Sequence, residues 1–423
     1  MKTLRHLVYL SIALLLFNPV SGQALSPTEQ LGKSVFMDES LSLYGNQSCA
    51  SCHGGEVGWT GPVSIINQYG SVYEGSNAGE FGDRKPPSAA YATQSPIFAL
   101  HRQGGGLFIG GNFWDGRATG EKLGNPAADQ AQGPFLNPAE QALLDSACVV
   151  YFVCIADYPV TLEDVYPDAC DIAWPVDVDT QCAPPGVLLD LDDANAALVD
   201  EAYDSIALSI AAYEASPEVN AFTSKYDAYL AGSADLNEQE RQGLRLFNGR
   251  GKCSRCHTSK EKQGQLPLFT DYSFDNLGVP RNVYNPVYAA RGPGWLDEGL
   301  GGFLTTRSEY AGMAEEHKGS QKVPTLRNVD LRPDPGFVKA FTHNGYFKTL
   351  KGIVHFYNTR DVKPVCVDPF ATEAEAMDLG CWPEPEFSES VNDDELGNLK
   401  LSDAQEDAIV AFLKTLSDGY MVP

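Results

Sequence analysis

The pentapeptides Cys49-Ala-Ser-Cys52-His53 and Cys253-Ser-Arg-Cys256-His257 decide how this chain of 423 residues is interpreted. Both have the form C-x-x-C-H, the signature of covalent c-type haem attachment. Two thiols one helical turn apart reach the two vinyl groups on one edge of a porphyrin, and the imidazole that follows is directed at the iron. A zinc or redox C-x-x-C that happens to precede histidine is the alternative. We expect two covalently bound haem c groups, with His53 and His257 as iron ligands.

The amino terminus has the pattern of a secretory signal. Lys2 and Arg5 precede an apolar run, residues 7–17, and small residues follow it. This pattern predicts a signal peptide over residues 1–24 that is cleaved on export, with an uncleaved anchor as the alternative. No later stretch approaches the roughly 20 apolar residues that cross a bilayer, so we expect no membrane span in the mature chain. Because haem is attached outside the cytoplasm, we expect a periplasmic protein.

Composition and charge exclude other classes of protein. The chain has 30 basic and 56 acidic residues, which gives a formal net charge of −26. This balance argues against binding to nucleic acid or anionic lipid, because both need a cationic face. It favours the attraction of basic partners. Hydrophobic residues make up 43% of the chain, which is typical of a globular protein.

The six cysteines outside the two motifs are even in number, as disulfide-bonded cysteines are. In a secreted chain they predict three disulfides, with fifteen possible pairings. A thiolate metal site is the alternative, but no histidine lies in either segment that carries them. These cysteines are Cys148, Cys154, Cys170, Cys182, Cys366 and Cys381.

The pattern of apolar residues predicts helices and a repeated organisation. Each motif follows a similar amphipathic stretch, residues 26–36 and residues 236–247. Helical spacing also predicts a helix over 194–215 and a last helix over 402–416. The break at Ser216-Pro217 places a domain junction near residue 220.

We therefore expect a mainly α fold with two cytochrome c-like haem domains, long loops and few strands. The first domain spans residues 25–220 and carries a cysteine-rich insertion at 146–186. The second domain spans residues 221–423.

Four further segments carry a resemblance to a known family. They are Phe113-Trp114-Asp115-Gly116-Arg117-Ala118, Gly133-Pro134-Phe135-Leu136-Asn137-Pro138-Ala139-Glu140, Val323-Pro324-Thr325-Leu326-Arg327-Asn328-Val329 and Ile409-Val410-Ala411-Phe412-Leu413. With both haem motifs in matching order, the chain resembles the bacterial di-haem cytochrome c peroxidase and MauG superfamily. The resemblance covers residues 26–417 apart from insertions.

The resemblance implies a role for each matching residue. The haem on His53 would react with peroxide, the haem on His257 would transfer electrons, and Trp114 would relay electrons between them. Glu140 would be the distal acid–base group, with Pro134 lining the same pocket. Cleavage of peroxide needs a group that moves a proton from one oxygen to the other, and a carboxyl in an apolar pocket can do so. Core packing of Trp114 and a solvated Glu140 are the alternatives.

The distal side of the first haem departs from the family pattern. Many family peroxidases carry a histidine there that must leave before peroxide binds. The matching stretch, residues 73–81, has no histidine, and Asn77 falls near that position. This suggests that the iron of the first haem has a free distal position in the protein as synthesised and needs no reductive activation. His101 is an alternative ligand.

The second haem also departs from the pattern, because Tyr357 stands where the peroxidases have a methionine ligand. Leu350, Ile353, Val354 and Tyr357 share one helical face, from which His355 points away. A tyrosine here resembles MauG, which matures a tryptophan-derived quinone in a partner protein. A phenolate stabilises ferric and higher iron states more than a thioether does. A core Tyr357, with Met313 or Met377 as the ligand, is the alternative.

A calcium ion between the haems is a further family feature. The family holds it through an Asn side chain, and Lys85 stands near that position. Calcium is therefore a possible but doubtful cofactor, because Lys85 would repel it.

Together these features predict a di-haem c-type oxidoreductase. It would reduce hydrogen peroxide with electrons from a small cytochrome or another periplasmic donor. The first alternative is a MauG-like enzyme that uses peroxide to oxidise Trp or Tyr residues of a partner protein. The second is a non-catalytic di-haem electron-transfer cytochrome.

Overall fold

The computed structural model describes residues 24–101, 106–262 and 264–422. The predicted signal peptide, apart from Ala24, lies outside the described residues. The described chain is mainly helical with few strands, as the sequence predicts. Its α-helices are α1 (Pro27–Met37), α2 (Cys49–Cys52), α3 (Ser64–Gln68), α4 (Pro126–Leu136), α5 (Ser146–Ile155), α6 (Leu162–Val165), α7 (Val178–Cys182), α8 (Asp193–Ala215), α9 (Lys225–Leu230), α10 (Glu238–Asn248), α11 (Val287–Arg291), α12 (Gly299–Thr305), α13 (Leu350–Thr359), α14 (Glu373–Leu379) and α15 (Asp403–Lys414).

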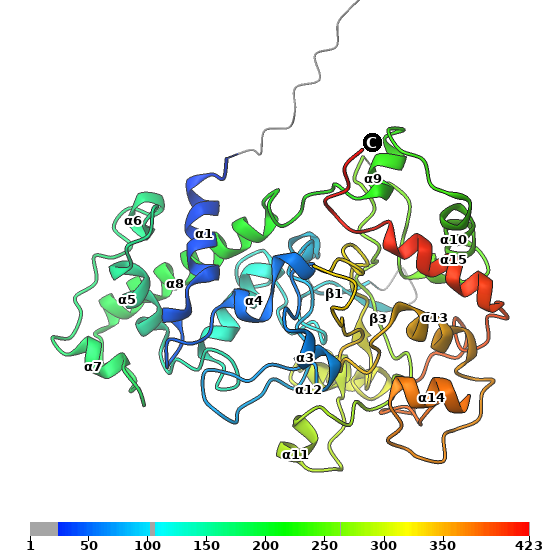
Figure 1. Ribbon diagram of the computed structural model, residues 1–423. Helices are drawn as coiled ribbons and strands as arrows, with labels where there is room; N and C mark the ends of the chain where they lie inside the picture. Colours follow the sequence, from blue (N-terminus) through cyan, green and yellow to red (C-terminus); the bar gives the residue numbers. More distant parts are fainter. Residues whose placement is uncertain (1–23, 102–105, 263, 423) are drawn as a thin grey trace, which may run out of the picture.

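The helices of the N-terminal half gather around the long helix α8. Helices α1, α4 and α5 all pack against it (Figure 1). A capping box between Ser26 and Glu29 starts α1, with proline at its first position. Phe36 at the other end of α1 packs edge-on against Tyr213 of α8, with 5.6 Å between ring centroids. One hydrophobic core, with buried members from residues 31 to 219, therefore forms around α8.

The C-terminal half has the same arrangement around its last helix. Helices α10 and α13 pack against α15, at the red end of the chain in Figure 1. Phe247 of α10 packs edge-on against Phe412 of α15, with 5.2 Å between ring centroids. The second core has buried members from residues 226 to 416. In both halves, the helix that precedes a C-x-x-C-H motif rests on the last helix of its own half.

A glycine makes the close helix contact in each half. A Cβ atom on Gly32 of α1 would lie 1.9 Å from the carbonyl oxygen of Ser209 in α8. A Cβ atom on Gly243 of α10 would lie 1.9 Å from the carbonyl oxygen of Ala408 in α15. Both contacts are backbone to backbone, so only glycine permits these helix crossings. The two halves therefore share the same close contact between helices, made at a glycine.

Two small antiparallel sheets lie where the halves meet. Strands β1 (Ala99–His101) and β2 (Leu107–Ile109) pair with Leu100 opposite Phe108. Strands β3 (Phe274–Asp275) and β4 (Gln321–Lys322) pair with Phe274 opposite Lys322. A small core of residues from both halves joins β1 and β2 to α12; its buried members are Phe98, Phe108, Leu300, Leu304 and Ala314.

Three disulfides form among the six remaining cysteines, as predicted. Two of them, Cys148–Cys182 and Cys154–Cys170, lie in the insertion that holds α5, α6 and α7. The third, Cys366–Cys381, flanks α14. These bonds close loops that would otherwise cost chain entropy on folding. The four cysteines of the haem motifs are not in disulfides.

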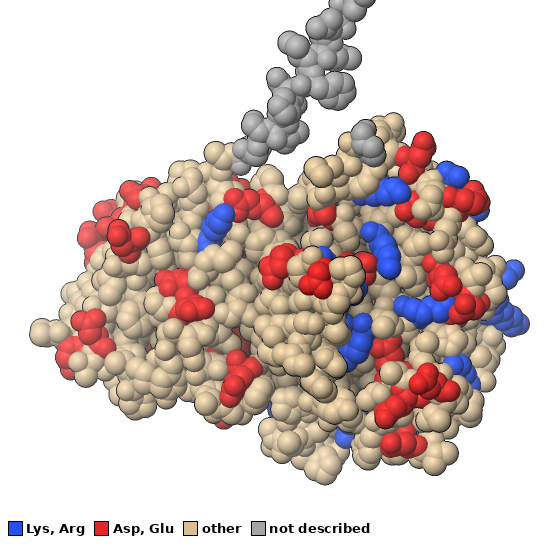
Figure 2. Space-filling model, viewed as in Figure 1, with Lys and Arg blue, Asp and Glu red and all other residues tan. Residues whose placement is uncertain are grey.

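The surface carries the acidic excess of the sequence. On the face shown in Figure 2, acidic side chains are spread over both halves, whereas most of the visible basic side chains lie over the C-terminal half. Within the described residues, no helix combines the length and the apolar character needed to cross a bilayer.

Replacing Gly243 with alanine is expected to lower the free energy of unfolding by about 1–3 kcal/mol, because the new methyl group forces α10 away from α15. Chemical denaturation of the haem-loaded protein measures this change. Gly312→Ala is the control, since a Cβ atom there meets nothing within 4 Å. Equal stability of the two variants would contradict the close-contact account.

Candidate functional site

The first motif forms one wall of a cavity in the N-terminal half. Cys49 and Cys52 begin and end α2, and His53 follows directly. The Nδ1 atom of His53 hydrogen-bonds to the carbonyl oxygen of Trp59 at 3.1 Å. This bond orients the ring and leaves Nε2 as the nitrogen available to a metal. Burial lowers the pKa of His53 to about 4, so the imidazole is neutral at pH 7.

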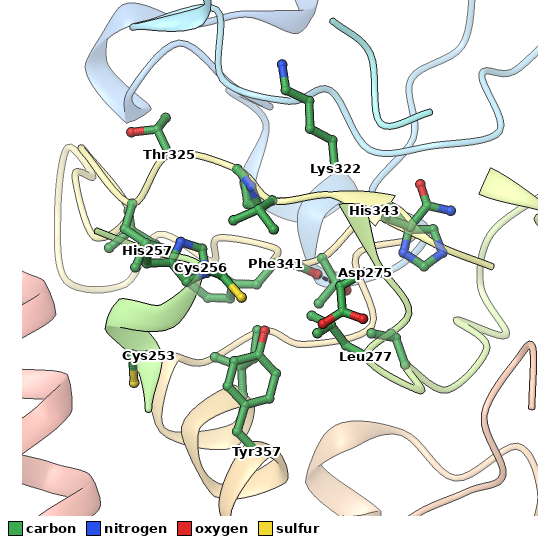
Figure 3. Close-up of a pocket in the computed structure, with 18 of the residues that line it drawn as sticks. Cys253, Cys256, His257, Asp275, Leu277, Lys322, Thr325, Phe341, His343 and Tyr357 are labelled. Atoms are coloured by element: carbon green, nitrogen blue, oxygen red, sulfur yellow. Dashed lines mark hydrogen bonds between the residues drawn. The ribbon is translucent and has the colours of Figure 1, made fainter. Parts of the chain in front are cut away.

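The second motif has the same local geometry in the C-terminal half. Cys253 lies in a 3₁₀ turn, Cys253–Arg255, and the Nδ1 atom of His257 hydrogen-bonds to the carbonyl oxygen of Phe269 at 2.8 Å. Across this cavity, the ring of Tyr357 rises from α13 with its hydroxyl directed towards Cys256 and His257 (Figure 3). Burial raises the pKa of the Tyr357 phenol above its ordinary value.

Both cavities have the features that a covalently attached haem requires. Their volumes are about 400 Å³ around His53 and about 230 Å³ around His257. Each presents two thiols outside any disulfide and one neutral imidazole whose second nitrogen is fixed by a carbonyl. Empty spaces of this size are rare in protein interiors. These residues therefore fit haem c in both cavities.

Glu140 lines the cavity that contains His53. It follows α4, and its Oε1 atom accepts a hydrogen bond of 2.8 Å from Nδ2 of Asn137. Burial raises the pKa of the Glu140 carboxyl, although Asn137 partly opposes this effect. Pro134, in the last turn of α4, lines the same cavity. The structure thus brings an acid with a raised pKa into the space that the first haem motif faces.

Trp114 lies between the two cavities and lines both. Its side chain is 7% exposed, and Nε1 donates a hydrogen bond of 2.8 Å to the carbonyl oxygen of Lys85. Its own carbonyl accepts a hydrogen bond of 2.7 Å from the backbone N–H of Lys322. The first bond fixes the indole and the second fixes the backbone of Trp114.

A buried ion-pair network holds the loop that carries Trp114. Arg84 donates to Asp115 in that loop at 2.6 Å and makes two bonds of 2.7 Å to Asp297, just before α12. Arg117 also donates to Asp115, at 2.8 Å. Burial alone would raise the pKa values of the two carboxyls, but Arg84 holds both below their ordinary range. Arg84 therefore ties the Trp114 loop to the C-terminal half.

The three alternative iron ligands considered from the sequence lie outside the cavities, as does Asn77, which stands near the family's distal histidine position. His101 is exposed on β1, and Asn77 bonds to the carbonyl of Pro138 at 3.4 Å. Met313 packs against the small core beside α12, and Met377 packs within the second core. None of these four side chains lines either cavity. His355 points away from the second cavity, as expected, and bonds to Glu406 at 2.9 Å.

Sequence reasoning missed three residues of the site. Arg84 carries the ion-pair network, Glu214 is a buried acid whose pKa is raised by burial to about 8, and Lys322 lines both cavities. Arg84 and Lys322 are next to residues that the sequence analysis did name, and this position is only a weak sign of a functional role. No feature of the sequence marks Glu214, because it lies in an ordinary amphipathic helix.

Comparison with known proteins finds relatives over most of the chain. Residues 26–235 match the family described as di-haem cytochrome c peroxidase. The chain is 33% identical over 399 residues to the methylamine utilization protein MauG of Paracoccus denitrificans, covering 93% of this chain and 89% of that protein. It is 25% identical over 328 residues to the cytochrome c551 peroxidase of Nitrosomonas europaea, covering 77% of this chain and 71% of that protein.

A solved structure has a similar fold. The diheme peroxidase BthA of Burkholderia thailandensis superposes with a TM-score of 0.70 at 28% identity, covering 94% of this chain and 87% of that chain. A variant of BthA in which a tyrosine is replaced by methionine gives a TM-score of 0.69.

Replacing Arg84 with methionine is expected to lower the free energy of unfolding by about 3–5 kcal/mol at neutral pH, because Asp115 and Asp297 stay buried without this counter-charge. Their depressed pKa values stabilise the fold, and this stabilisation is lost as pH falls from the ordinary aspartate pKa towards the lower values of the folded state. The difference from wild type is therefore expected to shrink as pH falls below roughly 5. Chemical denaturation of the haem-loaded protein at several pH values measures it.

Arg245→Met is the control for this substitution. It removes an exposed guanidinium 3.4 Å from Glu238 and is expected to leave stability unchanged at every pH. If the loss of unfolding free energy in Arg84→Met became larger towards acid pH, the ion-pair explanation would be wrong.

Proposed function

Because this chain belongs to the di-haem cytochrome c peroxidase family, whose members are peroxide-using oxidoreductases, we propose that it reduces hydrogen peroxide with electrons from another protein. We propose two cytochrome c-like domains, residues 25–220 and 221–423, in an exported periplasmic protein. His53 and His257 would hold the irons of two haem c groups. When bound, these groups supply the redox chemistry that breaks the O–O bond and stores oxidising equivalents.

The observation that carries the proposal is the half-buried carboxyl of Glu140, which lines the cavity of His53 and has a pKa raised by burial. Reduction of one peroxide takes up two electrons and two protons and releases two waters. Glu140 would accept the proton from one peroxide oxygen and return it to the other. Asn137 would hold the carboxyl in place through its 2.8 Å hydrogen bond, and Pro134 would help to exclude water.

Trp114 supports the transfer of electrons between the two sites. Trp114 lines both cavities, and a hydrogen bond from its indole to the carbonyl of Lys85 fixes the ring. An aromatic ring held in this position is a suitable bridge for electrons. Electrons would arrive from a small cytochrome or another donor at the C-terminal half, and the acidic excess of the whole chain favours a basic partner.

Tyr357 favours a second candidate function, in which the electrons come from Trp or Tyr residues of a partner protein. Its hydroxyl is directed towards the side of the second cavity that holds Cys256 and His257, and neither Met313 nor Met377 lines that cavity. As a phenolate ligand it would favour oxidised iron and the storage of oxidising equivalents. The chain is also 33% identical to MauG across most of its length. Turnover of peroxide with reduced cytochrome c, compared with turnover in the presence of a protein substrate, separates the two functions.

Replacing Glu140 with glutamine is expected to lower kcat/KM for peroxide by about 10²–10⁴-fold, because the amide cannot carry the proton. In the wild type, kcat/KM should fall as pH drops through the raised pKa of Glu140, since the protonated acid cannot accept the peroxide proton. The glutamine variant should lose this dependence. Steady-state turnover with reduced cytochrome c measures both effects.

The control for Glu140→Gln is Glu163→Gln, which changes an exposed acid on α6. Full turnover by Glu140→Gln would show that the acid–base role is wrong.

Absorption and electron paramagnetic resonance spectra of the isolated protein complete the test. A high-spin ferric signal beside a low-spin one supports an open first iron, whereas two low-spin signals would indicate an electron-transfer cytochrome.

Replacing Tyr357 with methionine is expected to raise the reduction potential of the second haem by at least about 59 mV, a tenfold change in the reduction equilibrium. A thioether stabilises ferric iron less than a phenolate does. Potentiometric titration followed by absorption spectroscopy measures the change. Tyr310→Met, in the small core beside α12, is the control. An unchanged potential in Tyr357→Met would exclude Tyr357 as a ligand.

A further inference from the structure

Lys85 is a buried cation at the junction of the two cavities. Its side chain lines both of them, yet the residue is only 8% exposed. Its backbone is fixed on two sides, because its N–H donates to the carbonyl of His343 at 2.7 Å and its carbonyl accepts from Trp114 at 2.8 Å. The position of its ammonium group is therefore set by both halves of the chain.

The ammonium group of Lys85 lacks a charged partner among the described residues. Its Nζ atom donates to Oγ1 of Thr60 at 2.7 Å and to the carbonyl of Pro86 at 3.0 Å, and both acceptors are neutral. No carboxylate lies within ion-pair distance of it in the described chain. A buried charge without a counter-charge is costly, and burial lowers the pKa of Lys85 to about 7, so the group stays fully charged at neutral pH only with an anionic partner from outside the polypeptide.

Two neighbouring buried lysines show what a complete set of acceptors looks like. Lys322 donates to Oγ of Ser95, the carbonyl of Gly111 and Oδ1 of Asn112. Lys339 donates to three main-chain carbonyls, those of Val57, Asn328 and Leu331. An ammonium group has three donors, so both lysines are satisfied by protein oxygens. Lys85 has two acceptors in the described chain, which leaves one donor open beside the cavities.

A metal ion does not fit at this junction. In the part of the chain that the structure describes, the one cluster of three acidic, cysteine or histidine ligand atoms is formed by Cys256, Asp275 and Glu395. This cluster contains the thiol of Cys256, which belongs to the second haem motif. At the junction itself, the Lys85 ammonium already occupies oxygens that a hard cation would need, and it would repel calcium. The family's calcium ion therefore disagrees with the residues present in this chain.

We propose that Lys85 replaces a metal ion as a built-in cation between the haems, and that its open donor binds a propionate carboxylate of a haem. This inference rests on the proposed attachment of haem in both cavities. A carboxylate supplies both the missing charge and the missing acceptor, and such a charge-assisted bond is among the strong ones. The protein would then need no calcium for its potentials or its stability.

Potentiometric titration of the haem-loaded Lys85→Met variant tests the inference. Loss of a positive charge beside a haem is expected to lower the reduction potential of at least one haem by about 59 mV, a tenfold change in its equilibrium. Lys85→Arg keeps the charge and should stay near wild type. Lys122→Met is the control, because its exposed ammonium pairs with Asp204 at 2.6 Å and its side chain lines neither cavity. Unchanged potentials in Lys85→Met would overturn the proposal.

Two measurements on the wild type need no variant. Metal analysis and calcium titration should find no bound calcium, and a chelator should leave the potentials and the melting temperature unchanged. A crystal structure of the haem-loaded protein should place the Lys85 Nζ atom within hydrogen-bond distance of a propionate oxygen. Tightly bound calcium, or a propionate directed elsewhere, would overturn the proposal. These readouts do not depend on peroxide turnover, so a failure of the enzymatic proposal remains distinguishable.

Discussion

The need to fill two apolar cavities is the constraint on which this structure depends. A chain that folds around spaces of about 400 and 230 Å³ loses stability unless another group occupies them. Both spaces are bounded by segments from both halves of the sequence, and Trp114, Lys85 and Lys322 belong to both walls. The occupants would therefore complete the interior and join the halves at the same time.

The two cavities are alike on one side and different on the other. On the side of each motif, a carbonyl oxygen fixes the imidazole of His53 or His257 in the same way. The remaining walls carry different groups, a carboxyl from Glu140 in one cavity and a phenol from Tyr357 in the other. Under the proposed function, the first site would move protons and the second would hold oxidised iron.

Much of the fold and of the site could be predicted from the sequence, because those parts depend on local patterns. The haem motifs, the helices around them and the helical face of Tyr357 all follow from spacing within a few residues. The ion pair between Arg84 and Asp297 could not be predicted, since the two residues lie 213 positions apart along the chain. The pairing of the disulfides was open for the same reason: cysteine count fixes their number but not their partners.

The arrangement of the ten cysteines has a consequence for how the protein matures. Four thiols must stay reduced for attachment while six others are oxidised to three pairs, all in one polypeptide. The four face inward, onto walls that assemble only when distant segments meet. Attachment of the proposed haem groups would therefore precede closure of the tertiary structure, in a compartment that protects those thiols from oxidants until then.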